Sequence, residues 1–214
     1  MTFTILMDNP KSWYYPFAKK LEADLSGKHE VHFCHAPEEV TSGDCLFLLS
    51  VEKVVKKEVL SKNKHNIVVH SSALPQGKGW SPITWQILEG KNEIPNTLFE
   101  AVEAVDAGVI YDQNIITLEG HELLDEIHDK QGEAINSLIL NFVSQLLNVT
   151  GKEQVGEETF YPKRGPKDSE LDPQKSISEQ FNLFRVSDNE KYPAFFNHKG
   201  HKYILKIYKA EDKP

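Results

Sequence analysis

Short apolar runs that alternate with amphipathic segments are the feature that most constrains the fold of this chain. Each run is apolar enough to form a buried strand, and helix-like periodicity fills the intervals between the runs. This alternation predicts an α/β fold with an open, mostly parallel sheet that has helices on both faces. The expected strands are residues 3–7, 31–34, 45–49 and 67–69, and the expected helices are residues 13–25, capped by Ser12, and residues 53–60.

The second half of the chain continues this pattern and then changes character. Residues 148–173 are rich in Gly, Pro, Lys and Glu, which predicts a connection rather than a packed element. We expect a Rossmann-like domain at residues 1–150, followed at residues 151–214 by a connecting segment and a small C-terminal helix and β-hairpin extension. The other expected elements are helices at 83–88, 121–147 and 178–186, strands at 97–102 and 108–118, and hairpin strands at 194–196 and 203–208 around Lys199–Gly200.

Composition and net charge exclude several classes of protein. Hydrophobic residues make up 39% of the 214 residues and charged residues 26%, which is typical of a globular protein with a real core. The formal net charge of -8 argues against DNA or RNA as the main partner, because a protein that binds such a polyanion normally has a strongly basic face. A small phosphate-bearing ligand stays possible, since it needs only a few local cations. No apolar run approaches a membrane span and the N-terminus lacks a signal-peptide pattern. We therefore expect a cytoplasmic protein without a membrane partner.

The cysteines and histidines do not have the spacing of metal ligands. Cys34 and Cys45 lie in apolar runs and are expected to be buried, reduced thiols. The nine histidines include no close-set pair of the kind that binds a metal ion. The sequence therefore predicts no metal site.

His70 and Asp106 are the candidate catalytic residues. His70 ends an apolar strand, and ligands of open parallel sheets bind beyond such strand ends. An imidazole there could accept a proton, and Asp106 could orient it and stabilise the imidazolium. Residues 75–82 hold two prolines and two glycines, which keep the intervening loop open. Taken singly, His70 also fits a hydrogen-bonded structural histidine, and Asp106 fits a turn before Gly108.

Together with this loop, the two residues resemble the folate-dependent formyltransferase family. Its motif is a strand that ends in His-x-Ser-x-Leu-Pro, followed by a glycine-rich loop and Asp-x-Gly. The likeness extends over nearly the whole chain, and residues 77–82, 85–90, 97–101 and 188–196 resemble its nucleotide-sugar branch. Residues 8–13 are similar to formyltransferases of the pseudaminic-acid pathway. The matching motif residues are His70, Ser72, Leu74, Pro75, Gly79, Asp106 and Gly108.

The resemblance implies a reaction and its substrates. The formyl group of 10-formyltetrahydrofolate would pass to the primary amine of a nucleotide-linked amino sugar, for example a UDP-linked 4-amino-4,6-dideoxy sugar. His70 would take part in proton transfer, and Asp106 would support it. Other members of the family formylate glycinamide ribonucleotide or methionyl-tRNA. The tRNA enzyme is expected to need a larger, basic C-terminal domain. A folate or nucleotide-sugar binding module that has lost catalysis is the alternative from another class.

One position departs from the family pattern. The family usually carries an asparagine two residues before the histidine, as a donor to the oxyanion, and here that position is Val68. Asn66 lies four residues before His70, about 13 Å away along an extended strand, so it could replace the amide only if the strand bulged. We expect a backbone amide, the hydroxyl of Ser72 or His70 itself to act instead.

The resemblance also assigns binding residues. Backbone groups of two segments would hold the pterin, although the valines of the first segment also fit plain core positions. For the acceptor, Trp13 could stack on a base or simply pack, Lys78 could bind a pyrophosphate or be a solvated loop lysine, and Arg185 could reach a phosphate or pair with a carboxylate. The aromatic hairpin is expected to pack against the main sheet or a second subunit, so a homodimer is predicted. The folate residues are Lys53, Val54, Val55, Glu103, Ala104 and Val105, and the acceptor residues are Asn9, Ser12, Trp13, Lys78 and Arg185.

Overall fold

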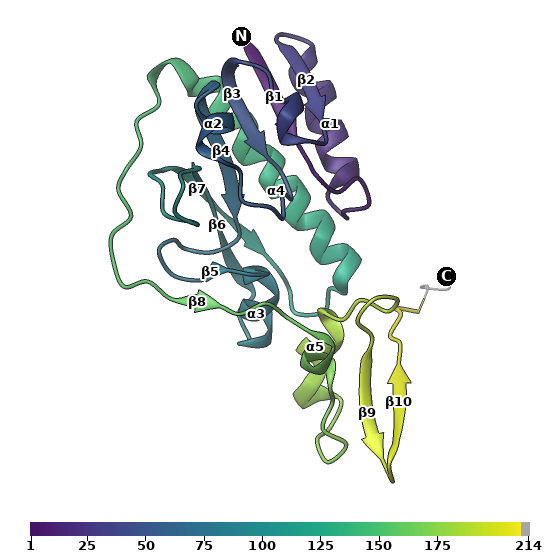
Figure 1. Cartoon of the computed structure of the whole chain (residues 1–214). Coiled ribbons are helices and arrows are strands. Elements are labelled where there is room, and N and C mark those ends of the chain that lie inside the picture. Colours follow the sequence, from purple (N-terminus) through teal and green to yellow (C-terminus); the bar gives the residue numbers. More distant parts are fainter. Residues whose placement is uncertain (211–214) are drawn as a thin grey trace.

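A six-stranded sheet in the order β2-β1-β3-β4-β6-β7 forms the centre of the computed structural model, which describes residues 1–210 (Figure 1). The first four of these strands are parallel, whereas β6 is antiparallel to both β4 and β7. The predicted mostly parallel α/β sheet is therefore confirmed. Its strands are β1 (Thr2–Leu6), β2 (Glu30–Cys34), β3 (Gly43–Leu48), β4 (Asn63–His70), β6 (Glu93–Glu100) and β7 (Ile110–Thr117).

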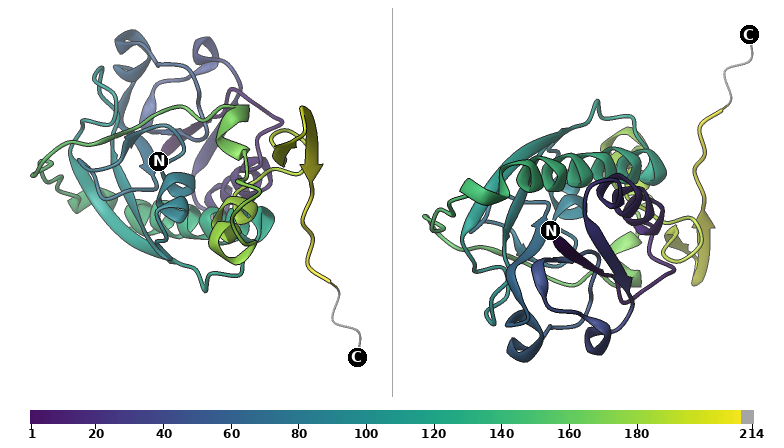
Figure 2. Two further views of the ribbon diagram at one scale, coloured as in Figure 1. Left: turned by 90° about the horizontal axis from the view of Figure 1, so that it is seen from below. Right: turned by 90° about the horizontal axis from the view of Figure 1, so that it is seen from above.

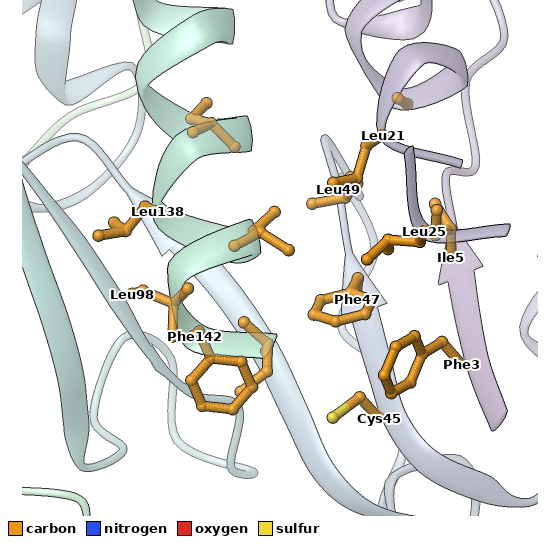
Figure 3. Close-up of a cluster of buried hydrophobic side chains, with 14 of the residues drawn as sticks. Phe3, Ile5, Leu21, Leu25, Cys45, Phe47, Leu49, Leu98, Leu138 and Phe142 are labelled. Carbon is orange, nitrogen blue, oxygen red and sulfur yellow. The ribbon is translucent and has the colours of Figure 1, made fainter. Parts of the chain in front are cut away.

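Two long helices, α1 (Tyr15–Ser26) and α4 (Leu124–Gln145), cover one face of the sheet (Figure 2). Figure 3 shows their apolar side chains meeting strand residues across this layer. Full burial of one such side chain contributes roughly 1.5–3 kcal/mol, so this layer is the main source of stability. The side chains in contact include Leu21 and Leu25 of α1, Leu138 and Phe142 of α4, and Phe3, Phe47 and Leu98 of the sheet.

The opposite face carries the smaller helix α2 (Lys57–Leu60) and the turn η1 (Pro37–Glu39). The predicted helix over residues 53–60 is too long, because residues 53–56 form a loop in which only Val55 is buried. The predicted cap of α1 is also wrong. That helix begins at Tyr15 with Pro16 in its first turn, although the Ser12 hydroxyl accepts a hydrogen bond from the Tyr14 amide at 3.3 Å.

The segment predicted as a connection crosses the body of the protein as a structural element (Figure 1). Its residues 152–161, which we call the strap, contain the short strand β8 (Phe160–Tyr161). β8 pairs in parallel with β5 (Lys78–Gly79), in the loop after β4. Further along, η3 (Pro166–Ser169) leads toward the C-terminal unit. The strap thus joins a loop that lies about 80 residues earlier in the sequence.

The C-terminal unit consists of a short helix and a hairpin, as predicted. Lys199 and Gly200 both have positive φ values, 47° and 80°, which is the geometry of a type I′ hairpin turn. The hairpin packs on α5 through Phe184 and Ala194 rather than on the main sheet, and it stands at the margin of the molecule in both views of Figure 2. The second hairpin strand ends at residue 205, three residues before the predicted end at residue 208. The elements of the unit are η4 (Ser178–Gln180), α5 (Phe181–Arg185), β9 (Ala194–His198) and β10 (His201–Leu205).

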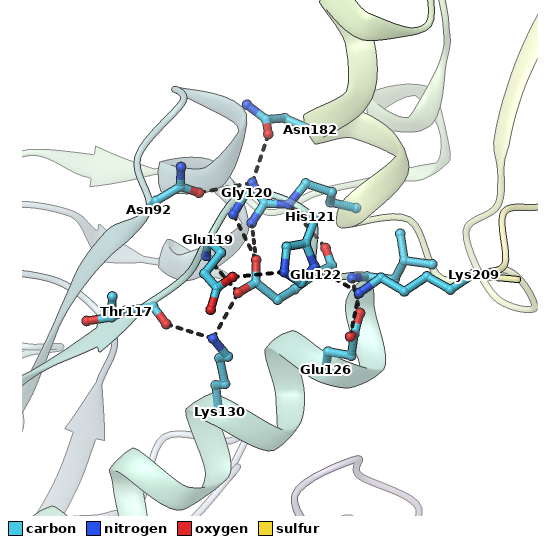
Figure 4. A network of polar contacts seen from close by, with 12 residues as sticks. Asn92, Thr117, Glu119, Gly120, His121, Glu122, Glu126, Lys130, Asn182 and Lys209 are labelled. Carbon is cyan, nitrogen blue, oxygen red and sulfur yellow. Dashed lines mark hydrogen bonds and ion pairs between the residues drawn. The ribbon is translucent and has the colours of Figure 1, made fainter. Parts of the chain in front are cut away.

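A buried ion pair joins this unit to the main domain (Figure 4). The guanidinium of Arg185, which is 1% exposed, contacts the Glu122 carboxylate at 3.2 Å and donates to the side chains of Asn92 and Asn182. Burial alone would raise the pKa of Glu122, but hydrogen bonds from Lys130 and from backbone amides lower it to about 2. Arg185 is therefore occupied in the interior, which corrects its predicted contact with the acceptor.

Three further observations concern residues 1–210 taken together. Cys34 and Cys45 are buried and unbonded to each other, as expected. Within residues 1–210, no helix combines the length and the apolar character needed to cross a bilayer. In the same residues, no three His, Cys, Asp or Glu side chains come together as a metal site.

Candidate active site

A cleft of about 510 Å³ opens where β1, β3 and β4 end. This is the edge at which open parallel sheets bind ligands, because the loops that follow neighbouring strands converge there. The loop after β3 and the loop between β6 and β7 both contribute to its wall. Among the residues that line it are Trp13, Leu48, Val68, His70, Phe99, Asp106 and Gln131.

His70 is placed at the cleft by the end of β4, as its sequence position predicts. Its Nε2 lies 2.8 Å from the carbonyl oxygen of Gly77. A carbonyl only accepts hydrogen bonds, so Nε2 bears the hydrogen and donates it. Nδ1 of His70 makes no hydrogen bond to any residue in the range 1–210. In a neutral imidazole this nitrogen holds the free lone pair, so His70 can accept a proton there.

Asp106 stands beside this histidine. One of its carboxylate oxygens lies 3.9 Å from Nε2 of His70 and accepts a hydrogen bond of 2.9 Å from the amide of Gly79. Asp106 has a φ of 52°, a left-handed conformation that costs roughly 1–2 kcal/mol for a residue with a side chain. Surrounding contacts must hold such a backbone in place. The carboxylate can stabilise positive charge on the imidazole after proton uptake.

The two glycines of the motif are required by close backbone approaches. A Cβ on Gly108 would lie 1.7 Å from the carbonyl oxygen of Glu100, and one on Gly79 would lie 2.6 Å from that of Tyr161. Neither contact is possible for a residue with a side chain. The Asp-x-Gly spacing thus lets the loop turn back against β6 directly after Asp106.

All six residues predicted to hold the folate line the cleft. They come from the loop after β3 and from the loop between β6 and β7, which the fold brings to the same cleft. Val55 is buried, whereas Val54 and Val105 are 73% and 61% exposed at the mouth. The residues are Lys53, Val54, Val55, Glu103, Ala104 and Val105.

The groups expected to replace the missing asparagine are differently placed. β4 runs from residue 63 to residue 70 without a bulge, and the Asn66 side chain turns to Glu100 at 3.2 Å, so Asn66 does not reach the site. Ser72 is 2% exposed beneath Gly77 and does not line the cleft, which leaves no access for the predicted contact of its hydroxyl with an oxyanion.

Gln131 of α4 lines the cleft and was missed by the sequence reasoning. Its amide donates to the Ser71 hydroxyl at 2.8 Å, directly beside His70. The signal was available, since Gln131 interrupts an apolar stripe between Ile127 and Ile135 at helical spacing. Gln131 therefore places a carboxamide at the cleft wall, whereas Val68, at the position where the family usually has asparagine, has none.

The predicted acceptor residues separate into two groups. Trp13 lines the cleft, and its ring stacks on His128 at 4.2 Å. Asn9 and Ser12 lie in the same loop after β1, although neither is among the lining residues. Lys78 is 3% exposed and its ammonium contacts Glu158 of the strap at 2.5 Å, so it does not present a free cation to a pyrophosphate.

The Trp13–His128 stack predicts a pH dependence of stability. Burial lowers the pKa of His128 to about 4, although the charges of Asp125 and Asp188 oppose this shift. The unfolded chain therefore takes up a proton between about pH 6.5 and pH 4 that the folded protein does not, and stability falls as the pH drops through this range. We expect urea unfolding at pH 5 to show a loss of about 2 kcal/mol relative to pH 7 from this group.

A His128→Phe variant keeps an aromatic ring against Trp13 and removes the titration. Its free energy of unfolding should fall less than that of the unchanged protein between pH 7 and pH 5. His32→Phe, at an exposed position of β2, is the matched control and should keep the original pH slope. Equal slopes for the His128→Phe variant and the unchanged protein would contradict the prediction.

Known proteins share this architecture. The family model described as formyl transferase matches residues 21–143, which is more than half of the chain. Methionyl-tRNA formyltransferase from Clostridium thermocellum superimposes with a TM-score of 0.82 at 19% identity, over 100% of this chain and 95% of that one.

Two other solved structures are similar in the same way. HypX from Aquifex aeolicus, in complex with tetrahydrofolic acid, gives a TM-score of 0.80 at 18% identity, over 96% of this chain but only 37% of that chain. A sugar N-formyltransferase from a Shewanella species gives 0.70 at 15% identity, over 100% of this chain and 99% of that one. At these identities the likeness establishes a common fold.

Proposed function

Since the chain belongs to the formyl transferase family, whose members are folate-dependent enzymes, we propose that it moves the formyl group of 10-formyltetrahydrofolate to the primary amine of a nucleotide-linked amino sugar. The observation that supports the proposal most directly is the pair of His70 and Asp106 at the edge of one cleft, with their polar atoms 3.9 Å apart. A proton acceptor and a supporting carboxylate are what formyl transfer to an amine requires.

The chain's own groups account for the proton movements of this reaction. The attacking amine forms a bond to the formyl carbon and releases a proton, which Nδ1 of His70 can accept. Asp106 stabilises the resulting imidazolium from the Nε2 side. When the bond from the formyl carbon to the folate nitrogen breaks, His70 returns the proton to that leaving nitrogen. The imidazole ends as it began, so a single histidine serves as both base and acid.

The amide of Gln131 is a candidate for the oxyanion contact. It lines the same cleft, whereas Val68 has no donor and the side chain of Ser72 is covered. A protonated His70 is a second candidate donor within the cleft. Preorganised donors of this kind stabilise the charge that develops on the formyl oxygen.

The shape of the cleft suits a flat folate ring. Its volume lies within the usual range for small-molecule sites, and apolar residues such as Leu48 and Phe99 form its inner wall. We place the pterin between residues 53–55 and residues 103–105. These segments carry few free polar side chains at the inner wall, so their backbone groups would recognise the ring edge.

The acceptor is proposed to extend from His70 toward the loop after β1. Trp13 offers an aromatic face for a nucleoside base, with Asn9 and Ser12 nearby for its polar edge. The likeness of residues 8–13 to enzymes of the pseudaminic-acid pathway favours a UDP-linked 4-amino-4,6-dideoxy sugar. The solved sugar N-formyltransferase of similar fold is consistent with this substrate class.

We further propose that the protein forms a homodimer through its C-terminal hairpin. β10 leaves Tyr203 and Ile204 46% and 58% exposed, and Tyr208 beyond it is 70% exposed. Exposed apolar side chains on both faces of a small projecting unit are typical of a protein interface.

A panel of amine acceptors tests the proposed function. Release of tetrahydrofolate from 10-formyltetrahydrofolate would be measured with UDP-, dTDP- and GDP-linked 4-amino sugars, glycinamide ribonucleotide and methionyl-tRNA. Turnover with an amino sugar supports the proposal, whereas turnover with methionyl-tRNA alone contradicts it. The tRNA arm is needed because the methionyl-tRNA formyltransferase of similar fold is aligned over 95% of its length, so chain length does not separate the two. The net charge of -8 still favours the sugar.

Replacement of Trp13 by alanine should weaken acceptor binding far more than folate binding. Loss of a stacked base costs roughly 1–3 kcal/mol, which predicts an increase of about 5- to 150-fold in the KM for the acceptor. The KM for 10-formyltetrahydrofolate should change less than about threefold. Steady-state kinetics with each substrate varied in turn would measure both. Tyr192→Ala, at an exposed aromatic side chain that does not line the cleft, is the matched control, and equal increases in both KM values for Trp13→Ala would mean that Trp13 only packs.

A further inference from the structure

The strap contacts both loops that hold the catalytic pair. At one end, Lys152 exchanges backbone hydrogen bonds with Ile110 at the start of β7, directly after the Asp106 loop. At the other end, the Thr159 hydroxyl accepts a hydrogen bond of 2.8 Å from the amide of Gly77. The carbonyl of this same Gly77 accepts the Nε2 hydrogen of His70. The two catalytic residues are thus linked through one segment of chain that contains neither of them.

Gln154 makes the most specific of these contacts. Its side-chain amide donates two hydrogen bonds of 2.9 Å, one to the carbonyl of Asp106 and one to the carbonyl of Gly108. The two hydrogen bonds therefore hold the backbone that directly follows the left-handed φ of Asp106. On its other side, the Asp106 carboxylate accepts the amide of Gly79, which lies in the strand that β8 pairs with.

Close packing shows that the strap is fitted to these loops. A Cβ on Gly79 would meet the carbonyl of Tyr161, and one on Gly77 would lie 2.9 Å from the Tyr161 ring. The Lys78–Glu158 ion pair and the hydrogen bond from the Trp85 indole to the Pro162 carbonyl add anchors on the same side.

We propose that the strap is a positioning element of the active site and that Gln154 fixes the Asp106 backbone so that its carboxylate faces His70. The inference rests on the proposed function, because it assigns Gln154 a role in the same transfer. Gln154 does not line the cleft, so it acts through Asp106 and not on the substrates.

The test uses Gln154→Met, which keeps the length of the side chain and removes both donors. We expect kcat to fall about 10- to 100-fold, since a displacement of about 1 Å in a catalytic group has effects of this size. In an Asp106→Asn background the same substitution should change kcat less than about twofold, because the group that Gln154 positions is already disabled. Additive losses in the two backgrounds would overturn the proposal. Gln145→Met, a surface position at the end of α4, is the matched control and should leave kcat unchanged.

Amide hydrogen exchange followed by NMR gives a readout that needs no substrate. In Gln154→Met, the Gly79 amide, which donates to Asp106, should exchange at least about tenfold faster. The amides of Lys78 and Trp80 donate to strap carbonyls instead and should stay slow. Unchanged exchange at Gly79, or equal acceleration at all three amides, would show that Gln154 does not position Asp106.

The kinetic and hydrogen-exchange experiments distinguish a failure of the proposed function from a failure of the role proposed for Gln154. If the unchanged protein formylates no amine, the proposed function fails, and the exchange at Gly79 alone decides the role of Gln154. If Gln154→Met does not fold, Gln154→Asn keeps the amide but draws it back by one methylene. The same kinetic coupling and the same exchange pattern are expected from it, at smaller amplitude.

Discussion

Replacement of His70 by asparagine should lower kcat by roughly 10²- to 10⁴-fold, which is the range for loss of a general acid–base group. Asparagine keeps a polar side chain of similar reach at the end of β4 but cannot accept a proton from the attacking amine. Binding of tetrahydrofolate should persist, because the segments proposed to hold the pterin do not include His70. Single-turnover kinetics and calorimetric titration with tetrahydrofolate would measure the two effects separately.

Two controls make this result specific. His32→Asn alters an exposed histidine of β2 and should leave kcat unchanged. Asp106→Asn should slow the reaction less than His70→Asn, because His70 can still accept the proton when its supporting charge is lost. If His70→Asn retained full turnover, catalysis by this residue would be excluded. If it lost folate binding together with turnover, the site would be a binding site that depends on the imidazole.

The second large effect is expected in stability, at the ion pair that docks the C-terminal unit. Glu122→Gln preserves the shape of the side chain but leaves the guanidinium of Arg185 buried without its carboxylate. Breaking a buried pair on one side costs about 3–5 kcal/mol, and a guanidinium cannot escape the cost by losing its proton. Urea unfolding should show a decrease of this size in the free energy of unfolding. Proteolysis should then cut first within residues 186–193, between α5 and the hairpin.

A neighbouring residue provides the control. Glu119→Gln neutralises an exposed side chain whose ion-pair partner among residues 1–210 is His121 alone, so it should change stability by less than about 0.5 kcal/mol. The double variant Glu122→Gln with Arg185→Met should be more stable than Glu122→Gln alone, because it no longer buries an unpaired cation. Failure of the second substitution to restore stability would show that the pair is not the main contact.

The Glu122 carboxylate also makes stability depend on pH in the acid range. The pKa of Glu122 is lowered to about 2 in the folded protein, so its contribution is complete above the ordinary carboxyl value of about 4.3 and is lost as the pH falls from there to about 2. His128 acts at higher pH, between about pH 6.5 and pH 4. The free energy of unfolding should therefore fall in two separate pH ranges, each of which one variant can remove.

Local pattern was enough to predict most of the sheet and one end of the site. β4 ends at His70 as expected, because a β-branched apolar run followed by a proline- and glycine-containing loop has few other conformations. The hairpin turn at Lys199–Gly200 was predictable for a similar reason, because a glycine between two apolar runs favours the positive φ that a tight hairpin turn needs. The helix expected at residues 53–60 is shorter in the structure because its periodicity is weak and only Val55 of residues 53–56 is buried.

Local pattern did not predict the interaction partners of the polar residues. Lys78 and Arg185 were predicted to meet phosphate groups, and the structure pairs them with Glu158 and Glu122, which lie 80 and 63 residues away in the sequence. A buried charge needs a partner, but the sequence does not show which charges the fold will bury. Gln154 was hidden for the same reason, since its two acceptors belong to a loop nearly 50 residues earlier.

The sequence by itself determined the order of strands and helices along the chain and the strand that ends at His70, because these follow from short-range periodicity and turn chemistry. The family was indicated separately, by the resemblance of the motif around His70 and Asp106. Only the tertiary structure decided which polar groups face the cleft and which are consumed in the interior. It turned Ser72 and Arg185 inward, brought Gln131 to the cleft wall and laid the strap across the catalytic loops. The reason is physical: the free energy of a polar side chain depends on its burial and its partners, and both are set by contacts between residues far apart in the chain.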